Sequence, residues 1–265
     1  MELGLNGKVA IVTGGSQGIG RAAATRMAAE GARVAICARR PDVLDEAAEG
    51  IKKKVGSDVI AVFADVTQQD QIEHLFETVV EAHGRLDILV NNAGTSSSGP
   101  FLEGSNEKWH ADLDLKLFGA IRCTRLAIPH MRAVSGGRII NVTSAGGKQP
   151  GAGSTPTSVS RAAGIALTKA LSKEYATDNI LVNTVCLGIL KAEQHDRLWH
   201  AERASEPELD RDEFYRRWAL EDRIALGRAG EAEEAGDVIA FLASERASYV
   251  TGVAINIDGG QSAVV

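Results

Sequence analysis

The chain has 265 residues, of which 44% are hydrophobic, and it carries a formal net charge of −6. This length allows a sizeable buried core, and the absence of a linker-like, repetitive or low-complexity stretch predicts a single domain. Lys and Arg are scattered and form no basic stripe, which argues against nucleic acid and anionic membranes as partners.

The three cysteines, Cys37, Cys123 and Cys186, are far apart and show no metal-ligand spacing. This pattern is typical of buried free thiols in a reducing compartment. The start of the chain runs directly into a predicted strand, and no apolar run approaches the length of a membrane span. We therefore expect a cytoplasmic protein with no bound metal.

Short apolar, β-branched runs alternate with longer amphipathic stretches, which predicts parallel strands joined by crossover helices. The strands are nearly all apolar, as expected where helices cover both faces of a sheet. The predicted strands are Lys8–Val12, Arg33–Cys37, Val59–Phe63, Leu86–Val90, Arg138–Val142, Ile180–Val185 and Val253–Ile257. The predicted helices are Ile19–Glu30, Val43–Lys54, Gln68–His83, Lys108–Met131, Ser158–Thr177 and Glu231–Ala243.

Residues 190–228 break this alternation. They are charged, with Trp199, Phe214, Tyr215 and Trp218 interspersed, and predict a helical flap over the carboxyl edge of the sheet. One interpretation is a substrate lid, because ligands of such sheets lie beyond the carboxyl ends of the strands. The other is a surface helix pair with the aromatic residues packed beneath it.

A glycine-rich turn, Thr13-Gly14-Gly15-Ser16-Gln17-Gly18-Ile19-Gly20, follows the first strand and opens a helix. Gly14 allows a tight turn, Gly18 allows close approach of a pyrophosphate, and Gly20 allows close packing of helix and strand. Amides at the helix start then face the phosphates. The spacing is Gly-x3-Gly-x-Gly rather than the commoner Gly-x-Gly-x2-Gly, and on its own such a motif can be only a turn.

Two further motifs favour a dinucleotide site. Asp65-Val66 follows the third strand, where a carboxylate can accept a hydrogen bond from an adenine amine. Asn91-Asn92-Ala93-Gly94 follows the fourth, where the strand order changes and a crevice opens. The alternative for Asn91 is that it only caps a turn.

With these motifs the chain resembles the short-chain dehydrogenase/reductase superfamily, and its acyl-carrier ketoreductase-like branch in particular. The resemblance runs from about Gly4 to Gly260 and includes a C-terminal stretch, Gly227-Arg228…Glu233-Glu234…Phe241-Leu242-Ala243-Ser244…Thr251-Gly252…Asp258-Gly259-Gly260. It implies a Rossmann-type α/β fold with a doubly wound, seven-stranded parallel sheet flanked by helices. It also implies a bound NAD or NADP, with Gly188 and Ile189 beside it, and a tetramer or dimer that pairs through helices 108–131 and 158–177.

The end of the second strand decides between the two cofactors, because an acidic residue there binds the ribose hydroxyls whereas Arg binds a 2′-phosphate. The chain reads Cys37-Ala38-Arg39-Arg40 and has no carboxylate before Asp42. Arg39 and Arg40 therefore predict a preference for NADP(H), with NAD(H) as the alternative. Gln17 adds no further positive charge. The alternative is that Arg39 and Arg40 are only a solvated pair of surface residues.

Members of this superfamily use Ser, Tyr, Lys and Asn to reduce carbonyl groups, and here only the Ser is present, as Ser144. Thr157 stands where the resemblance places the Tyr, thirteen residues after Ser144, and Arg161 stands in place of the Lys. The Asn position, three residues before Gly119, is Lys116. Leu187 and Ala192 replace the usual Pro and Thr after the sixth strand.

These exchanges change the chemistry. An aliphatic hydroxyl is a far weaker acid than a phenol of pKa ~10, and loss of a positioned general acid typically costs ~10²–10⁴ in rate. Arg161 can hold a ribose or an oxyanion but relays no proton. Lys116 has three interpretations: a replacement acid with a pKa lowered by Arg161, a ligand for a substrate carboxylate or phosphate, or a residue that faces solvent or pairs with Asp112 or Asp114.

His110 and His195 can also donate protons, but no spacing supports either, and we expect both at the surface. The leading hypothesis is an NADP(H)-dependent oxidoreductase that interconverts a carbonyl and a hydroxyl group of a small molecule by an altered proton path. A first alternative is a homologue with little or no turnover that acts as a sensor or partner subunit. A second is a non-redox enzyme, such as a dehydratase or isomerase, that binds another nucleotide-bearing ligand.

Overall fold

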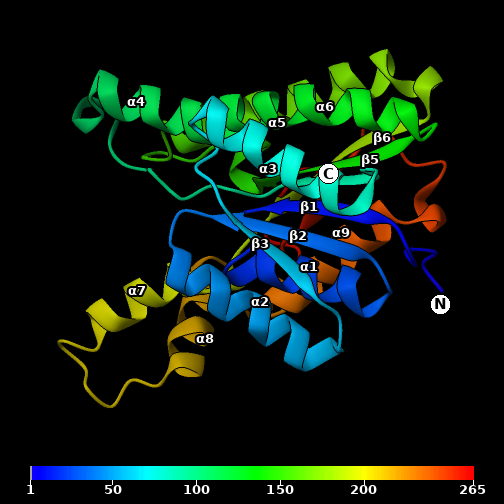
Figure 1. Ribbon diagram of the computed structural model, residues 1–265. Coiled ribbons are helices and arrows are strands. Elements are labelled where there is room, and N and C mark those ends of the chain that lie inside the picture. Colours follow the sequence, from blue (N-terminus) through cyan, green and yellow to red (C-terminus); the bar gives the residue numbers. More distant parts are fainter. Residues whose placement is uncertain (1) are drawn as a thin grey trace.

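A seven-stranded parallel sheet forms the centre of the computed structural model, which describes residues 2–265 (Figure 1). Its strand order is β3-β2-β1-β4-β5-β6-β9, so the predicted doubly wound α/β fold is confirmed. The strands are β1 (Val9–Thr13), β2 (Arg33–Ala38), β3 (Val59–Phe63), β4 (Ile88–Asn91), β5 (Gly137–Ser144), β6 (Ile180–Leu187) and β9 (Ala254–Ile257). A separate short pair joins β7 (Leu190–Lys191) to β8 (Gly230–Glu231).

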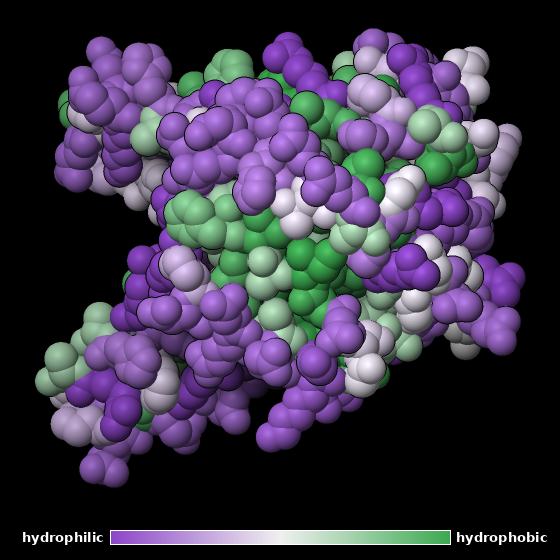
Figure 2. All heavy atoms as spheres, viewed as in Figure 1, coloured by the Kyte–Doolittle hydropathy of each residue, from purple (hydrophilic) through white to green (hydrophobic). Residues whose placement is uncertain are grey.

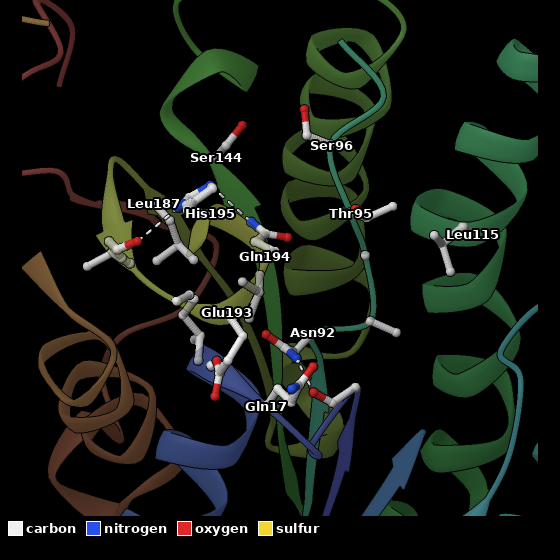
Figure 3. A pocket seen from close by; sticks show the side chains of 18 of the residues that line it. Gln17, Asn92, Thr95, Ser96, Leu115, Ser144, Leu187, Glu193, Gln194 and His195 are labelled. Atoms are coloured by element: carbon white, nitrogen blue, oxygen red, sulfur yellow. Dashed lines mark hydrogen bonds between the residues drawn. The ribbon is translucent and has the colours of Figure 1, made fainter. Parts of the chain in front are cut away.

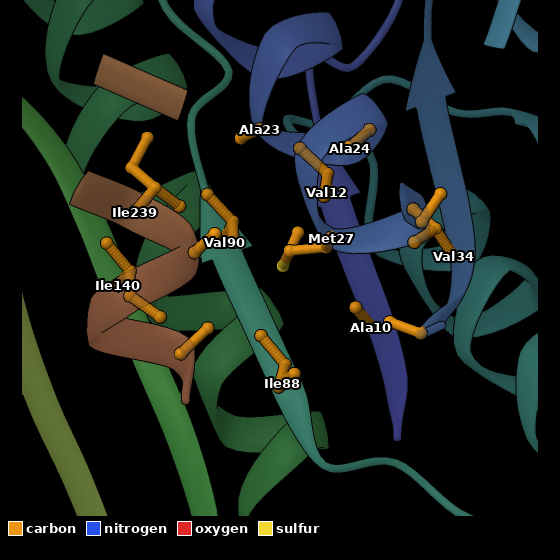
Figure 4. Packing of buried hydrophobic residues seen from close by; sticks show 14 of the residues in the cluster. Ala10, Val12, Ala23, Ala24, Met27, Val34, Ile88, Val90, Ile140 and Ile239 are labelled. Atoms are coloured by element: carbon orange, nitrogen blue, oxygen red, sulfur yellow. The ribbon is translucent and has the colours of Figure 1, made fainter. Parts of the chain in front are cut away.

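Helices cover both faces of the sheet. One layer contains α1 (Gly18–Ala29), α2 (Pro41–Val55) and α9 (Ala232–Ala243), and the other contains α3 (Gln69–His83), α5 (Gly119–Ala133) and α6 (Thr157–Glu174) (Figure 1). Every residue of β1 is buried, which explains why the central strands are apolar on both faces. Figure 4 shows Ala23, Ala24 and Met27 of α1 packed among apolar residues of the sheet and Ile239 of α9.

Two element boundaries differ from the prediction for a physical reason. The apolar runs end at Val142 and Val185, but β5 continues to Ser144 and β6 to Leu187. The extra residues stay in register, and the Thr143 hydroxyl donates to the Val185 carbonyl at 3.1 Å. A buried polar residue with an internal partner therefore continues a strand beyond its hydrophobic pattern.

The predicted helix 108–131 is divided in the structure. It consists of α4 (Asn106–Leu113), a π-helical turn (Asp114–Phe118) and α5. Such a turn widens the helix locally and is frequent at functional sites. Here it contains Lys116, which is 8% exposed. Short 3-10 turns occupy Phe101–Glu103, Ala145–Gly147, Ala176–Asp178 and Glu245–Ala247.

The segment after β7 forms α7 (Glu193–Glu202) and α8 (Arg211–Glu221), which extend from the carboxyl edge of the sheet at the lower left of Figure 1. Their aromatic residues share a small cluster of their own: Phe214 and Tyr215 are buried, and Trp199 and Trp218 pack against it. The Trp199 indole also donates to the Leu209 carbonyl at 2.9 Å. The aromatic residues thus stabilise this helix pair from within.

The two helix layers present mostly polar surfaces, as Figure 2 shows in the same view. A band of hydrophobic residues lies between the layers, over the edge strand β3, where Phe63 is 48% exposed. On the left the surface is hollowed between the α4 end of one layer and the α7–α8 segment, at the carboxyl ends of the strands.

The close approach of α1 to the turn that precedes it depends on Gly20. A Cβ atom added there would overlap the Gly14 carbonyl oxygen and the Asn92 side chain. We expect Gly20→Ala to lower the free energy of unfolding by ~1–3 kcal/mol, because the backbone must shift. The matched control is Gly50→Ala in α2, where an added Cβ meets nothing within 4 Å and the gain in helix propensity adds ~0.5–1 kcal/mol. Urea unfolding measures both, and equal effects of the two substitutions would contradict this account.

Candidate functional site

A pocket of about 820 Å³ opens at the carboxyl edge of the sheet, where β1 and β4 lie side by side and the strand order reverses. Most of the predicted site residues line it (Figure 3). They are Gly14, Ser16, Gln17, Gly18, Ile19, Arg39, Arg40, Asp65, Val66, Ala93, Gly94, Ser144, Thr157, Arg161, Gly188 and Ile189. Gly20, Asn91 and Lys116 lie behind the lining instead.

The glycine turn leaves the first turn of α1 open toward the pocket. Gly14 and Gly18 have φ angles of 64° and 51°, a conformation that favours glycine. Gln17, at the N-cap, makes no side-chain hydrogen bond to the helix; its side-chain oxygen accepts from Arg40 instead. The backbone N–H groups at the start of α1 are therefore available to an anionic ligand.

Two cations stand at the end of β2, at one end of the pocket. The side chain of Arg39 is 63% exposed and its guanidinium lies 3.9 Å from the Asp65 carboxylate. Arg40 is held by its hydrogen bond to Gln17. Asp65 in turn accepts hydrogen bonds from the Thr67 amide and hydroxyl, both at 2.9 Å. The pocket therefore combines a carboxylate with two cations at this end.

The two asparagines at the end of β4, Asn91 and Asn92, point in opposite directions. Asn91 is buried and donates to Asn141 at 2.9 Å and to Thr124 at 3.2 Å, so its side chain bonds within the protein. Asn92, which the sequence reasoning did not single out, lines the pocket and holds the glycine turn by donating to the carbonyls of Thr13 and Gly14. Successive residues of a strand alternate in direction, and this signal could have identified Asn92.

Arg161 lines the pocket and is partly buried. One Nη donates to the Val142 carbonyl at 2.7 Å, whereas its buried Nε has no hydrogen-bond partner among residues 2–265. Burial lowers the pKa of Arg161 to about 10, so the group remains a cation at neutral pH. A buried donor without a partner is costly, and Arg161 is among the residues that line the pocket.

Lys116 is buried next to Thr157. Its ammonium pairs with the Asp112 carboxylate and donates to the Thr157 hydroxyl oxygen at 2.9 Å. The side chains of Lys116 and Asp112 are 1% and 0% exposed, so Lys116 does not point to solvent. The other Asp112 oxygen accepts from the Ser160 hydroxyl at 2.6 Å.

Burial is the largest cause that lowers the pKa of Lys116 to about 8, and the positive charge of Arg161 lowers it further while Asp112 opposes the shift. The expected repulsion by Arg161 is present, but burial contributes more to the shift. The loss of hydration on burial destabilises the ammonium more than the repulsion by the neighbouring cation does.

The Thr157 hydroxyl connects this buried group to the pocket. It accepts from Lys116 and from the Ser97 amide, the latter at 2.8 Å, and it donates to the Asp112 carboxylate at 3.4 Å. The contact to Asp112 is the longest of the three, so the hydrogen bond that the Thr157 hydroxyl donates is the weakest of the three.

The start of the α7 segment contributes residues that the sequence reasoning missed. Glu193, Gln194 and His195 line the pocket, so the expectation of a surface position for His195 is wrong. Its Nδ1 lies 2.9 Å from the Leu190 carbonyl oxygen, its ring meets Trp218 edge-on, and burial lowers its pKa. These residues come shortly after β6 and the short strand β7, and their place at the carboxyl edge of the sheet was the available signal. His110 is exposed.

Within residues 2–265, no cluster of three or more His, Cys, Asp or Glu side chains is placed to bind a metal ion. Among the same residues, none of the helices is both long and apolar enough to span a membrane. The three cysteines are free and buried.

A family model described as enoyl-(acyl carrier protein) reductase matches residues 14–262. A 3-oxoacyl-[acyl-carrier-protein] reductase of Thermotoga maritima is 39% identical, over 97% of this chain and 98% of its own length. The structure of L-sorbose reductase from Gluconobacter frateurii, in complex with NADPH and L-sorbose, matches with a TM-score of 0.93 and 36% identity over the full length of both chains. A short chain oxidoreductase from Pseudomonas aeruginosa, described as containing an atypical catalytic center, matches with a TM-score of 0.94 and 33% identity, over 99% of this chain and all of that one.

The fold agrees with these solved structures over nearly the whole chain, and the family model covers residues 14–262. The chain therefore belongs to the short-chain dehydrogenase/reductase superfamily of oxidoreductases.

Proposed function

We propose that the protein is an NADPH-dependent oxidoreductase that interconverts a carbonyl and a hydroxyl group, and that Lys116 supplies the proton through Thr157. The contact that carries this proposal is the 2.9 Å hydrogen bond from the Lys116 ammonium to the Thr157 hydroxyl, which links a buried proton source to a pocket-lining side chain. The L-sorbose reductase structure, with NADPH and a sugar bound, supports the same class of reaction.

The residues present fit the cofactor. The uncapped start of α1 can hold a diphosphate, and Arg39 and Arg40 can meet a 2′-phosphate. The unpartnered Nε of Arg161 suits the ribose hydroxyls of the nicotinamide half. When bound, NADPH supplies the hydride that reduces the carbonyl carbon.

Side chains that line the pocket then bind and protonate the carbonyl oxygen of the substrate. Ser144 orients the carbonyl oxygen, and the partly buried positive charge of Arg161 stabilises the negative charge that develops on it. The Thr157 hydroxyl gives its proton to that oxygen and takes one from the Lys116 ammonium. Asp112 holds Lys116 in place and is itself held by Ser160. Each turnover thus consumes one hydride and one proton.

We also propose a cytoplasmic homo-oligomer, a tetramer or a dimer, that pairs through α5 and α6. Exposed apolar side chains beside these helices support this pairing: Phe118 is 48% and Val159 is 43% exposed. The segment 190–228 would then act as the substrate flap of a single domain, because its first residues line the pocket.

Replacement of Arg39 tests the cofactor assignment. We expect Arg39→Ala to weaken NADPH binding by ~10-fold or more, because charge-assisted hydrogen bonds typically contribute ~1.5–3 kcal/mol, and to leave NADH binding unchanged. Isothermal titration calorimetry with both nucleotides measures the difference. Arg26→Ala removes the same charge from the far part of α1, where Arg26 pairs with Glu30 and Asp237, and serves as the control. Equal weakening of both nucleotides by Arg39→Ala would refute the assignment.

The proton path is tested by the alkaline limb of the pH profile. Because the pKa of Lys116 is lowered from 10.5 to about 8, the ammonium loses its proton as the pH rises through that value, and we expect kcat for carbonyl reduction to fall there. Lys116→Arg keeps the charge but stays protonated, so the limb at about pH 8 should disappear. An unchanged profile in this variant would eliminate Lys116 as the donor.

The relay hydroxyl is tested by an isosteric substitution. Thr157→Val removes the hydroxyl that links Lys116 to the pocket, and we expect kcat to fall by ~10²–10⁴, the usual contribution of a positioned acid. NADPH affinity should change little, and its fluorescence on binding provides that control. Steady-state oxidation of NADPH with a panel of ketones and hydroxyketones measures the rate. If the unmodified protein binds NADPH but reduces none of them, the proposed activity is wrong.

A further inference from the structure

The carboxylate of Glu193 lies over the part of the pocket that is suited to a diphosphate. Glu193 is the first residue of α7, and its Oε2 is 3.4 Å from the position that a Cβ on Gly18 would occupy. Its Oε1 accepts from the Arg21 guanidinium, in the second turn of α1, at 2.9 Å. Figure 3 shows the Glu193 side chain extending from the α7 segment toward the start of α1, near Gln17.

The position of the Glu193 carboxylate matters because it places a negative charge at the start of α1. The N–H groups at the start of a helix and its dipole attract an anion, and Gln17 does not cap α1. In the free protein, Glu193 brings a negative charge of the chain itself to that region. A bound diphosphate would add like charges to the same place, and Arg21, a cation of α1, is already engaged by Glu193.

We propose that Glu193 is an intramolecular competitor of the cofactor diphosphate, and that the cofactor binds by displacing its carboxylate from Arg21 and the start of α1. This inference rests on the proposed binding of NADPH at the glycine turn. It makes Glu193 a residue that sets cofactor affinity without being a ligand of the cofactor.

The Arg21–Glu193 pair is weak enough to be exchanged. The two side chains are 47% and 33% exposed, and partly exposed pairs of this kind change an equilibrium constant by up to about fivefold. Two phosphates at a helix start have more charge and more hydrogen-bond acceptors than one carboxylate, so the exchange favours the cofactor.

The exchange also connects the cofactor to the flap. Gln194 and His195 follow Glu193 directly and line the pocket, while the rest of the segment is held by other pairs, such as Arg211 with Asp196 at 2.8 Å. Release of Glu193 therefore frees the end of the flap that borders the substrate part of the pocket, after the cofactor has arrived.

The test is calorimetric titration of NADPH into the unmodified protein and Glu193→Gln at low ionic strength. We expect Glu193→Gln to bind NADPH roughly 3- to 10-fold more tightly, because a like charge is removed at short range. The gain should shrink in about 0.5 M salt, which screens partly exposed charges. It should be absent with 2′-AMP, which carries the 2′-phosphate but no diphosphate. Glu193→Ala should give the same gain if the charge, and not the amide of Gln, is responsible.

The matched control is Asp212→Asn. Asp212 lies in the first turn of α8, pairs with Lys191 at 2.7 Å and does not line the pocket, so the same change of charge there should leave NADPH affinity unchanged. Unchanged or weaker NADPH binding in both Glu193 variants overturns the inference, as does an equal gain with 2′-AMP or with Asp212→Asn. If neither the unmodified protein nor a Glu193 variant binds NADPH, the proposed function fails as well.

Discussion

The floor of the pocket depends on one buried carboxylate. Asp112 receives the Lys116 ammonium on one oxygen and the Ser160 hydroxyl on the other, so it joins α4, the π-helical turn and α6. Removal of one partner from such a buried pair typically costs about 3–5 kcal/mol, because the remaining charge is left without compensation. The pairing of Asp112 with Lys116 also fixes the position of Thr157, whose hydroxyl accepts a hydrogen bond from Lys116 at the pocket surface. Stability and chemistry therefore depend on a single side chain here.

The balance of charge around this carboxylate supports the proposed chemistry. Two cations, the buried Lys116 and the partly buried Arg161, lie near one buried anion, Asp112. An excess of positive charge beside a pocket is unfavourable in the free protein, and it becomes favourable when an oxygen of the ligand acquires negative charge. The unpartnered Arg161 Nε is consistent with a site that is completed by its ligand.

The fold was predictable because it follows from periodicity and turn chemistry. The parallel strands, the crossover helices and the glycine turn follow from apolar runs, helical spacing and the residues at strand ends, whereas the doubly wound seven-stranded sheet was implied by the family resemblance. Asn92 and Glu193 carried signals that the sequence reasoning did not use: the alternation of side chains along a strand and the position at the carboxyl edge of the sheet. The burial of Lys116 was not predictable, because a π-helical turn depends on tertiary packing that local patterns do not encode.

The division of helix 108–131 at Asp114–Phe118 has a consequence for the recognition of active sites in sequences. The residue that we assign as proton donor reaches Thr157 across 41 positions of the chain and from a different helix. A motif that tests only positions 144, 157 and 161 would classify this chain as catalytically silent. A search of this superfamily for active sites should therefore also test whether a titratable side chain occupies position 116.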